Sequence, residues 1–165
     1  VMRSKKIIVI AHCCLNQNTV VPGWDRARGA YPFIKQLIQR GYGILQLPCP
    51  ETLALGIDRP PMDYDEYNTP EHRSLCEKLC DIPVQMVKHH HDAGDRLIGI
   101  IGIRYSPNCA LSDQRGVFMK ILLERLEEIK PSLPLIEVPV EYIESKPEAQ
   151  AAFMQELDQW IKDNQ

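Results

Sequence analysis

The sequence has no long hydrophobic segment and little net charge. No apolar run approaches the ~20 residues that a membrane-spanning helix requires, and the first apolar run ends at His12, which argues against a secretory signal. The formal net charge of the 165 residues is only −3, so a nucleic acid or an anionic membrane is not expected as a partner. We therefore expect a soluble, unprocessed, cytoplasmic protein. A chain of this length should form a single domain, residues 1–165, with one core.

Several short motifs are also missing. No G-x-G-x-x-G follows the first apolar run, which argues against a dinucleotide cofactor. No C-x-x-C or C-x-C pair is present, which makes structural zinc a weaker hypothesis. Six cysteines do occur, and in a chain without a secretory signal they are expected as thiols or metal ligands rather than as disulfides.

The apolar residues alternate between strand-like runs and helical periods. Runs rich in Ile, Val and Leu predict buried parallel strands at 7–11, 44–47, 96–103 and 134–138. Helical spacing predicts helices that include Phe33, Leu75, Val117 and Phe153. Strands that alternate with helices indicate the α/β class, a Rossmann-like three-layer α/β/α sandwich with a mainly parallel sheet of about four strands.

The segment between the second and third strands is expected to contain a loop and one long helix. Residues 52–68 hold Gly and Pro and no sustained period, so we expect a long loop that serves as a lid. Thr69 and Pro70 are typical of a helix start, and Pro83 should kink that helix. Its expected apolar positions are Leu75, Leu79, Ile82 and Met86.

Cys13, Cys49 and Cys109 each lie just beyond one of the first three predicted strands. Because ligands bind beyond the carboxyl ends of parallel strands, we expect these cysteines to meet at one edge of the sheet. Three thiolates without a fourth protein ligand fit a [4Fe-4S] cluster bound at three corners, with one iron open as a Lewis acid. The alternative is that all three are ordinary buried thiols.

The remaining cysteines and histidines are weaker candidates. Cys14 should point away from Cys13, and Cys76 and Cys80 lie four apart on a helix, where packing is the simpler interpretation. His89–His91 fall at a helix end that favours partly charged imidazoles. His12 adjoins Cys13 and is a candidate to orient a substrate or carry a proton, although it could equally pack at the strand end.

At these positions the sequence resembles the 2-thiouracil desulfidase family, and most of all a subgroup of desulfidases related to that enzyme. The resemblance runs from Ile7 to about Pro139. It rests on Cys-Pro-Glu at Cys49–Glu51, on Ser-Pro-x-Cys at Ser106–Cys109, and on Cys13 followed by Leu15. The sequence departs from the typical pattern at the positions His12, Asn16, Asn108 and Ala110.

The resemblance implies a Rossmann-like fold, a [4Fe-4S] cluster on Cys13, Cys49 and Cys109, and non-redox removal of sulfur from a thiolated nucleobase or similar heterocycle. The proposed catalytic residues of the family match Glu51 and Ser106. Glu51 is placed to take a proton from the attacking water, and Ser106 to hydrogen-bond the ring or relay a proton. Otherwise Glu51 and Ser106 would only cap neighbouring turns.

Polar residues near the cysteines are the candidates for substrate contacts. The first choices are His12, Asn16, Asn18 and Asn108, and the loop after the first strand adds Gln17, Trp24, Arg26 and Arg28. Two other functions stay open. One is a non-catalytic cluster or metal module that acts as a sensor or sulfur carrier, and the other is a thiol oxidoreductase that uses Cys13 with Cys14 or with another cysteine at the sheet edge. The sequence also leaves open whether the chain is a monomer or a homodimer.

Overall fold

The secondary structure alternates between strands and helices along the chain. The computed structural model describes residues 1–112 and 114–165. Its elements are, in order, β1 (Lys6–Ile10), the 3-10 turns η1 (His12–Cys14) and η2 (Gln17–Thr19), α1 (Ile34–Gln39), β2 (Gly43–Gln46), α2 (Pro50–Leu55), α3 (Tyr64–Tyr67), α4 (Pro70–Asp92), β3 (Arg96–Ile103), α5 (Val117–Glu127), β4 (Leu135–Val138) and α6 (Pro147–Asp163).

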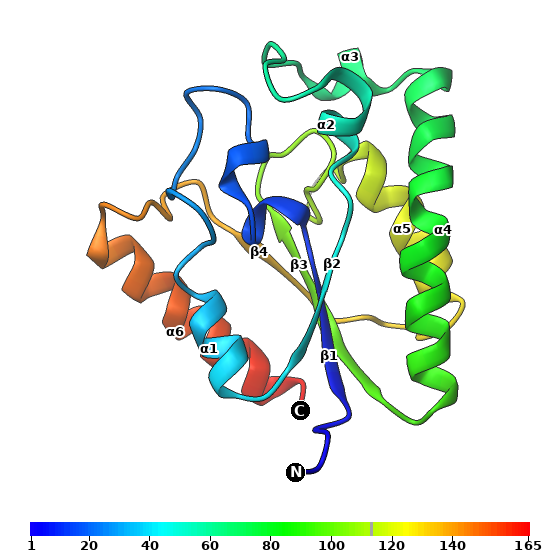
Figure 1. Cartoon of the computed structure of the whole chain (residues 1–165), viewed down its shortest axis with the longest axis vertical. Helices are drawn as coiled ribbons and strands as arrows, with labels where there is room; N and C mark the ends of the chain where they lie inside the picture. Colours follow the sequence, from blue (N-terminus) through cyan, green and yellow to red (C-terminus); the bar gives the residue numbers. More distant parts are fainter. Residues whose placement is uncertain (113) are drawn as a thin grey trace.

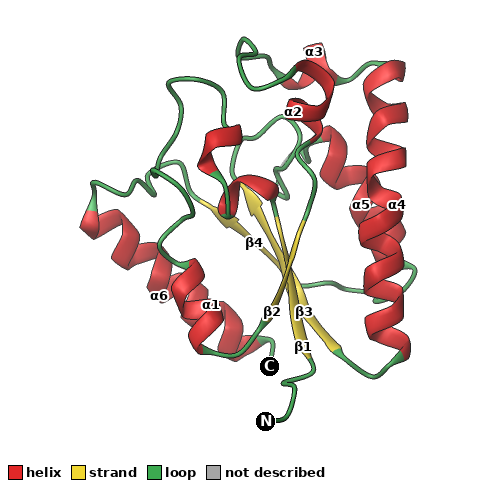
Figure 2. Ribbon diagram, in the orientation of Figure 1, coloured by secondary structure: helices red, strands yellow, loops and turns green. Residues whose placement is uncertain are grey.

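The four described strands form one parallel sheet in the order β2-β1-β3-β4. Helices α1 and α6 cover one face of this sheet, and α4 and α5 cover the other (Figures 1 and 2). The predicted Rossmann-like three-layer sandwich is thus confirmed. Strand β1 lies between β2 and β3, with Val9 opposite Leu45 on one side and Ile100 on the other.

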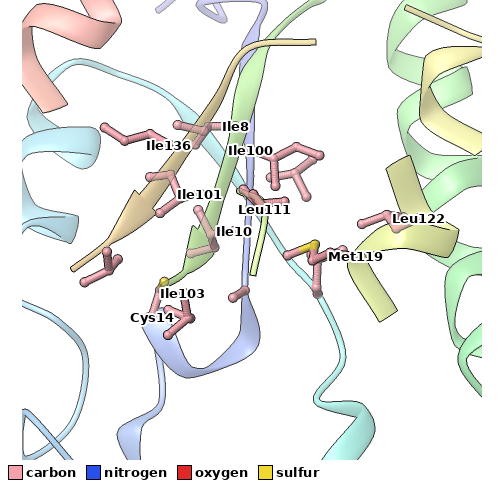
Figure 3. Close-up of a cluster of buried hydrophobic side chains, with 14 of the residues drawn as sticks. Ile8, Ile10, Cys14, Ile100, Ile101, Ile103, Leu111, Met119, Leu122 and Ile136 are labelled. Atoms are coloured by element: carbon pink, nitrogen blue, oxygen red, sulfur yellow. The ribbon is translucent and has the colours of Figure 1, made fainter. Parts of the chain in front are cut away.

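The core lies on both faces of the two central strands. Ile8, Ile10, Ile100 and Ile101 are fully buried, as expected for parallel strands that are covered on both sides. Figure 3 shows these side chains together with Met119 and others from α5, which approach the sheet from one face. Because the core fixes the register of β1, it also fixes where the chain leaves the sheet toward the first cysteine.

The segment predicted as one long loop, residues 52–68, contains two short helices instead. Helix α2 begins at Pro50, with Cys49 as its N-cap, and the Cys49 sulfur accepts a hydrogen bond from the Thr52 backbone N–H. Helix α3 begins with a reciprocal capping box between Asp63 and Glu66. Both helices are too short to show an apolar period, which explains why the periodicity missed them.

Helix α4 differs from the expectation in its buried face. It is a single helix of 23 residues that continues through Pro83. Its buried positions are His72, Cys76, Cys80, Pro83 and Val87, whereas Ile82 and Met86 are 72% and 46% exposed. Small apolar thiols let α4 pack closely against α5. Neither α4 nor any other helix in the described ranges is long and apolar enough to cross a membrane.

Candidate functional site

The structure brings Cys13, Cys49 and Cys109 together at the carboxyl ends of neighbouring strands. Cys13 lies in η1 directly after β1, Cys49 caps α2 after β2, and Cys109 lies in the turn after β3. All three line one pocket of about 330 Å³. The pocket lies where an open α/β sheet binds ligands, beyond the strand ends and near β1 and β3, between which the order of strand addition reverses.

Burial and neighbouring negative charges raise the pKa values of the Cys13 and Cys109 thiols. Burial raises the pKa of the Cys13 thiol to about 12, and the negative charges of Cys49 and Glu51 add to the effect. Burial likewise raises the pKa of Cys109 well above its ordinary value, with contributions from Cys13 and Cys49. Three thiolates in this pocket would therefore require positive charge nearby, to which Arg26 contributes and which iron would supply in a cluster.

The donor set is of the kind that an iron–sulfur cluster uses, because thiolate is the usual ligand of such a cluster. Among the described residues, no group of three or more His, Cys, Asp or Glu side chains is arranged to hold one metal ion. A four-iron cluster takes each cysteine at a different iron. The Thr52 N–H, 3.4 Å from the Cys49 sulfur, is the kind of backbone donor that stabilises a thiolate ligand.

The turn that carries Cys109 is fixed by Ser106 and by two glycines. The Ser106 Oγ accepts hydrogen bonds from the backbone N–H groups of Cys109 (3.0 Å) and Asn108 (3.4 Å), so Ser106 does cap its own turn. A side chain at Gly102 would lie 2.5 Å from the Cys109 carbonyl oxygen, and one at Gly116 would lie 2.6 Å from the Cys109 nitrogen. Ser106 also lines the pocket, and its hydroxyl proton is still available for donation.

Glu51 lies in the first turn of α2 and lines the same pocket, although the residue is only 9% exposed. Its Oε1 accepts a hydrogen bond from Arg59 Nε at 3.1 Å, and its Oε2 accepts one from Asn108 Nδ2 at 3.0 Å. Each oxygen thus has one donor from the protein. A carboxylate accepts more hydrogen bonds than this, so each oxygen keeps acceptor capacity toward the pocket.

Arg59 is a site residue that the sequence reasoning did not single out. Its side chain is buried, and it donates hydrogen bonds to the Thr19 carbonyl (2.7 Å), the Gly56 carbonyl (3.1 Å) and the Thr52 hydroxyl as well as to Glu51. Arg59 lies within the segment that was expected to be a lid loop. No pattern in the sequence around Arg59 indicates that it pairs with Glu51, because a single arginine between Gly56 and Pro60 is also typical of an exposed loop.

His12 and Gln17 organise the first cysteine turn. His12 Nδ1 lies 2.9 Å from the Leu47 carbonyl oxygen, and because a carbonyl only accepts, Nδ1 carries a proton and donates this hydrogen bond. Gln17 is buried, and its Nε2 donates to the Cys13 carbonyl at 3.0 Å. Both residues line the pocket.

Of the other candidate substrate contacts, Trp24 and Arg26 line the pocket. The remaining candidates, Asn16, Asn18, Arg28 and Asn108, lie outside the lining. Asn16 caps η2, and its Oδ1 accepts hydrogen bonds from the backbone and side chain of Asn18. Arg28 pairs with Glu144 on the surface. Asn108 is fully buried behind Glu51 and does not reach the pocket.

The pocket walls are mainly apolar and its mouth carries two exposed aromatic rings. Trp24 is 62% exposed and Tyr105 is 71% exposed, and both line the pocket. Tyr105 has a left-handed backbone with φ of 63°, which is unusual for a bulky residue and is often found at functional sites. The Arg104 guanidinium lies 5.0 Å from the centre of the Tyr105 ring.

The remaining cysteines and histidines are structural or lie elsewhere. Cys14, Cys76 and Cys80 are fully buried in the core. His89–His91 form the last turn of α4, where His90 contacts Asp95 at 2.8 Å. The burial of the three cysteines agrees with a role in packing, and the position of the histidines agrees with a role at the helix end.

Comparison with known proteins places the chain in a family. No family model matches it, and no solved structure matches it. The uncharacterized protein MJ0003 of Methanocaldococcus jannaschii is 37% identical to it over 139 residues, which are 84% of this chain and 88% of the archaeal protein. Such identity over most of both chains shows common descent, and the chain belongs to the same protein family as MJ0003.

Proposed function

We propose that the protein is an iron–sulfur-dependent, non-redox desulfidase that hydrolyses the C=S bond of a thiolated nucleobase or similar heterocycle and releases sulfide. The observation that supports this proposal most strongly is the composition of one pocket: three cysteines, one carboxylate and one hydroxyl, namely Cys13, Cys49, Cys109, Glu51 and Ser106. Three thiolate ligands with no fourth would leave one iron open.

A bound [4Fe-4S] cluster would supply an exposed iron, a Lewis acid with affinity for the soft sulfur of a thiocarbonyl. Glu51 takes a proton from the water that adds to the thiocarbonyl carbon, and Ser106 donates a hydrogen bond to the heterocycle. One water is consumed, the carbon–sulfur bond is replaced by a carbon–oxygen bond, and hydrogen sulfide leaves. No electron is gained or lost by the protein.

The environment of Glu51 suits a base that works as a carboxylate. Its two partners, Arg59 and Asn108, are both donors, which is what a negatively charged carboxylate requires. They hold the side chain at the pocket wall rather than leave it free in solvent. Such fixed placement raises the fraction of time in a reactive geometry.

The pocket mouth suits a planar and largely apolar substrate. Trp24 and Tyr105 present exposed rings on which a heterocycle can stack. Val20, Val21 and Val140 contribute apolar walls. The partner in this proposal is therefore a small-molecule thiolated heterocycle.

The thiol oxidoreductase hypothesis is less well supported. A redox-active cysteine needs a lowered pKa to provide thiolate near neutral pH. Burial raises the pKa of Cys13 to about 12, and that of Cys109 is raised as well. In a metal-free protein both would be poor nucleophiles.

The test is to purify or reconstitute the protein without oxygen and to measure iron, acid-labile sulfide and the visible spectrum. We expect about four iron and four sulfide per chain, and sulfide release from thiolated nucleobases. Zinc alone, or no metal after reconstitution, would overturn the proposal. A full cluster without sulfide release would instead favour the non-catalytic sensor or sulfur carrier.

A further inference from the structure

A line of buried hydrogen bonds connects Glu51 to a histidine that lies outside the pocket. Asn108 donates from Nδ2 to Glu51 Oε2 at 3.0 Å, and its Oδ1 lies 2.7 Å from Nε2 of His72. Asn108 is fully buried, and His72 is 7% exposed. Neither residue lines the pocket.

The chemistry of Glu51 fixes the direction of both hydrogen bonds. A carboxylate only accepts, so the amide nitrogen of Asn108 must face Glu51 and the amide oxygen must face His72. His72 Nε2 therefore carries a proton, and this N–H donates a hydrogen bond to the Asn108 oxygen. The opposite amide orientation would place the Asn108 oxygen against the carboxylate and a nitrogen donor against the imidazole N–H.

His72 is held rigidly, so it can hold Asn108 in turn. It occupies the third position of α4, where its backbone N–H donates to the hydroxyl of the N-cap Thr69 at 3.1 Å. The ring of Tyr67 packs against the imidazole with 4.9 Å between ring centres. A long helix and a buried ring are firmer supports than a surface loop.

We infer that Asn108 and His72 are positioning residues for Glu51, with His72 holding Asn108 in the one amide orientation that donates to the carboxylate. The catalytic meaning of this inference rests on the proposed function, in which Glu51 accepts the proton of water. The hydrogen-bonded arrangement of His72, Asn108 and Glu51 does not depend on the proposed function.

Two matched substitutions at His72 separate positioning from simple packing. His72→Gln keeps an N–H donor near the position of Nε2, whereas His72→Phe keeps a ring against Tyr67 but removes the donor. Without that donor, the Asn108 oxygen is buried without a partner and the amide is free to turn. We expect His72→Phe to lower kcat about 10- to 100-fold with KM and iron content unchanged, as is typical when an outer partner of a site is lost. His72→Gln should restore kcat to within about threefold of the unchanged protein.

A second measurement does not depend on turnover. In 15N-labelled protein, the side-chain NH2 of Asn108 should exchange slowly with solvent and should keep its resonance positions in His72→Gln. In His72→Phe the same signals should shift and exchange faster. Thermal midpoints of both variants, measured in parallel, separate this local effect from unfolding.

The outcomes distinguish the two levels of the proposal. Equal kcat and equal Asn108 signals in His72→Phe and the unchanged protein would overturn the positioning role. The expected shift of the Asn108 signals in a protein that releases no sulfide from any thiolated heterocycle would leave the hydrogen-bonded line intact and overturn the proposed function alone.

Discussion

The Cα atom of Gly116 rests directly against the peptide bond that follows Asn108. A Cβ atom at Gly116 would lie 2.1 Å from the carbonyl carbon of Asn108 and 2.4 Å from its oxygen, far inside van der Waals contact. Gly116 is also the N-cap of α5. The start of this helix and the turn of Cys109 are therefore packed as one unit.

We expect Gly116→Ala to disturb the Cys109 turn. The new methyl group would clash with backbone atoms of Asn108 and Cys109, which cannot rotate away as a side chain can. The turn must therefore move, which we expect to lower the free energy of unfolding by about 1–3 kcal/mol. Iron content after anaerobic reconstitution should fall together with the thermal midpoint. Gly29→Ala is the matched control, because a Cβ there meets no atom within 4 Å. Equal iron content in the two variants would contradict the prediction.

Loss of Arg59 should destabilise the protein strongly. Arg59→Ala leaves the Glu51 carboxylate buried without its cationic partner, which typically costs about 3–5 kcal/mol. Urea denaturation of the metal-free protein measures the loss. Arg125→Ala is the comparison, since the Arg125–Asp81 pair is exposed and should contribute no more than about 1 kcal/mol. Similar losses for both variants would show that Arg59 is not a special support.

Glu51 and Cys49 should separate catalysis from cluster binding. Glu51→Gln keeps the shape of the side chain but removes the base, so the visible absorption of the cluster should remain while sulfide release is lost. Cys49→Ala removes a ligand and should lose both. A fully active Glu51→Gln protein would exclude Glu51 from the mechanism.

Alkaline pH should destabilise the packing between α4 and α5. Burial raises the pKa of Cys80 from its ordinary value of 9.0 to about 12, so between these values the unfolded chain releases a proton that the folded chain retains. The contribution of this thiol is present below pH 9 and falls above it, by up to about 1.4 kcal/mol per pH unit.

The variant Cys80→Ala tests this dependence. It should be less stable than the unchanged protein near pH 7, because it leaves a small cavity. Between pH 9 and 11, however, its free energy of unfolding should decline less steeply. Parallel curves for the two proteins would mean that Cys80 does not titrate with a raised pKa.

Much of the fold was accessible from the sequence because it depends on buried strands. The Ile-rich runs at β1 and β3 are covered on both faces, and such runs have few other interpretations. The gathering of Cys13, Cys49 and Cys109 follows from the parallel sheet alone, since three successive strands end at the same edge.

The partners of Glu51 were not accessible in the same way. Arg59 contacts Glu51 from a segment without periodicity, and His72 lies on a helix whose buried face was assigned to the larger apolar residues. Asn108 was expected to face the substrate but lies behind Glu51. Hydrogen bonds between distant side chains depend on tertiary packing, which leaves no regular spacing in the sequence.

The sulfur of Cys49 serves the fold as well as the pocket, because it caps α2 through the Thr52 N–H. Serine is among the best N-cap residues, so Cys49→Ser preserves the helix start while it removes the soft ligand. Position 49 therefore allows one ligand of the proposed cluster to be removed from a protein that is otherwise folded. Exchanging this one atom gives a reference protein in which the pocket wall is kept and the proposed cluster has lost a ligand.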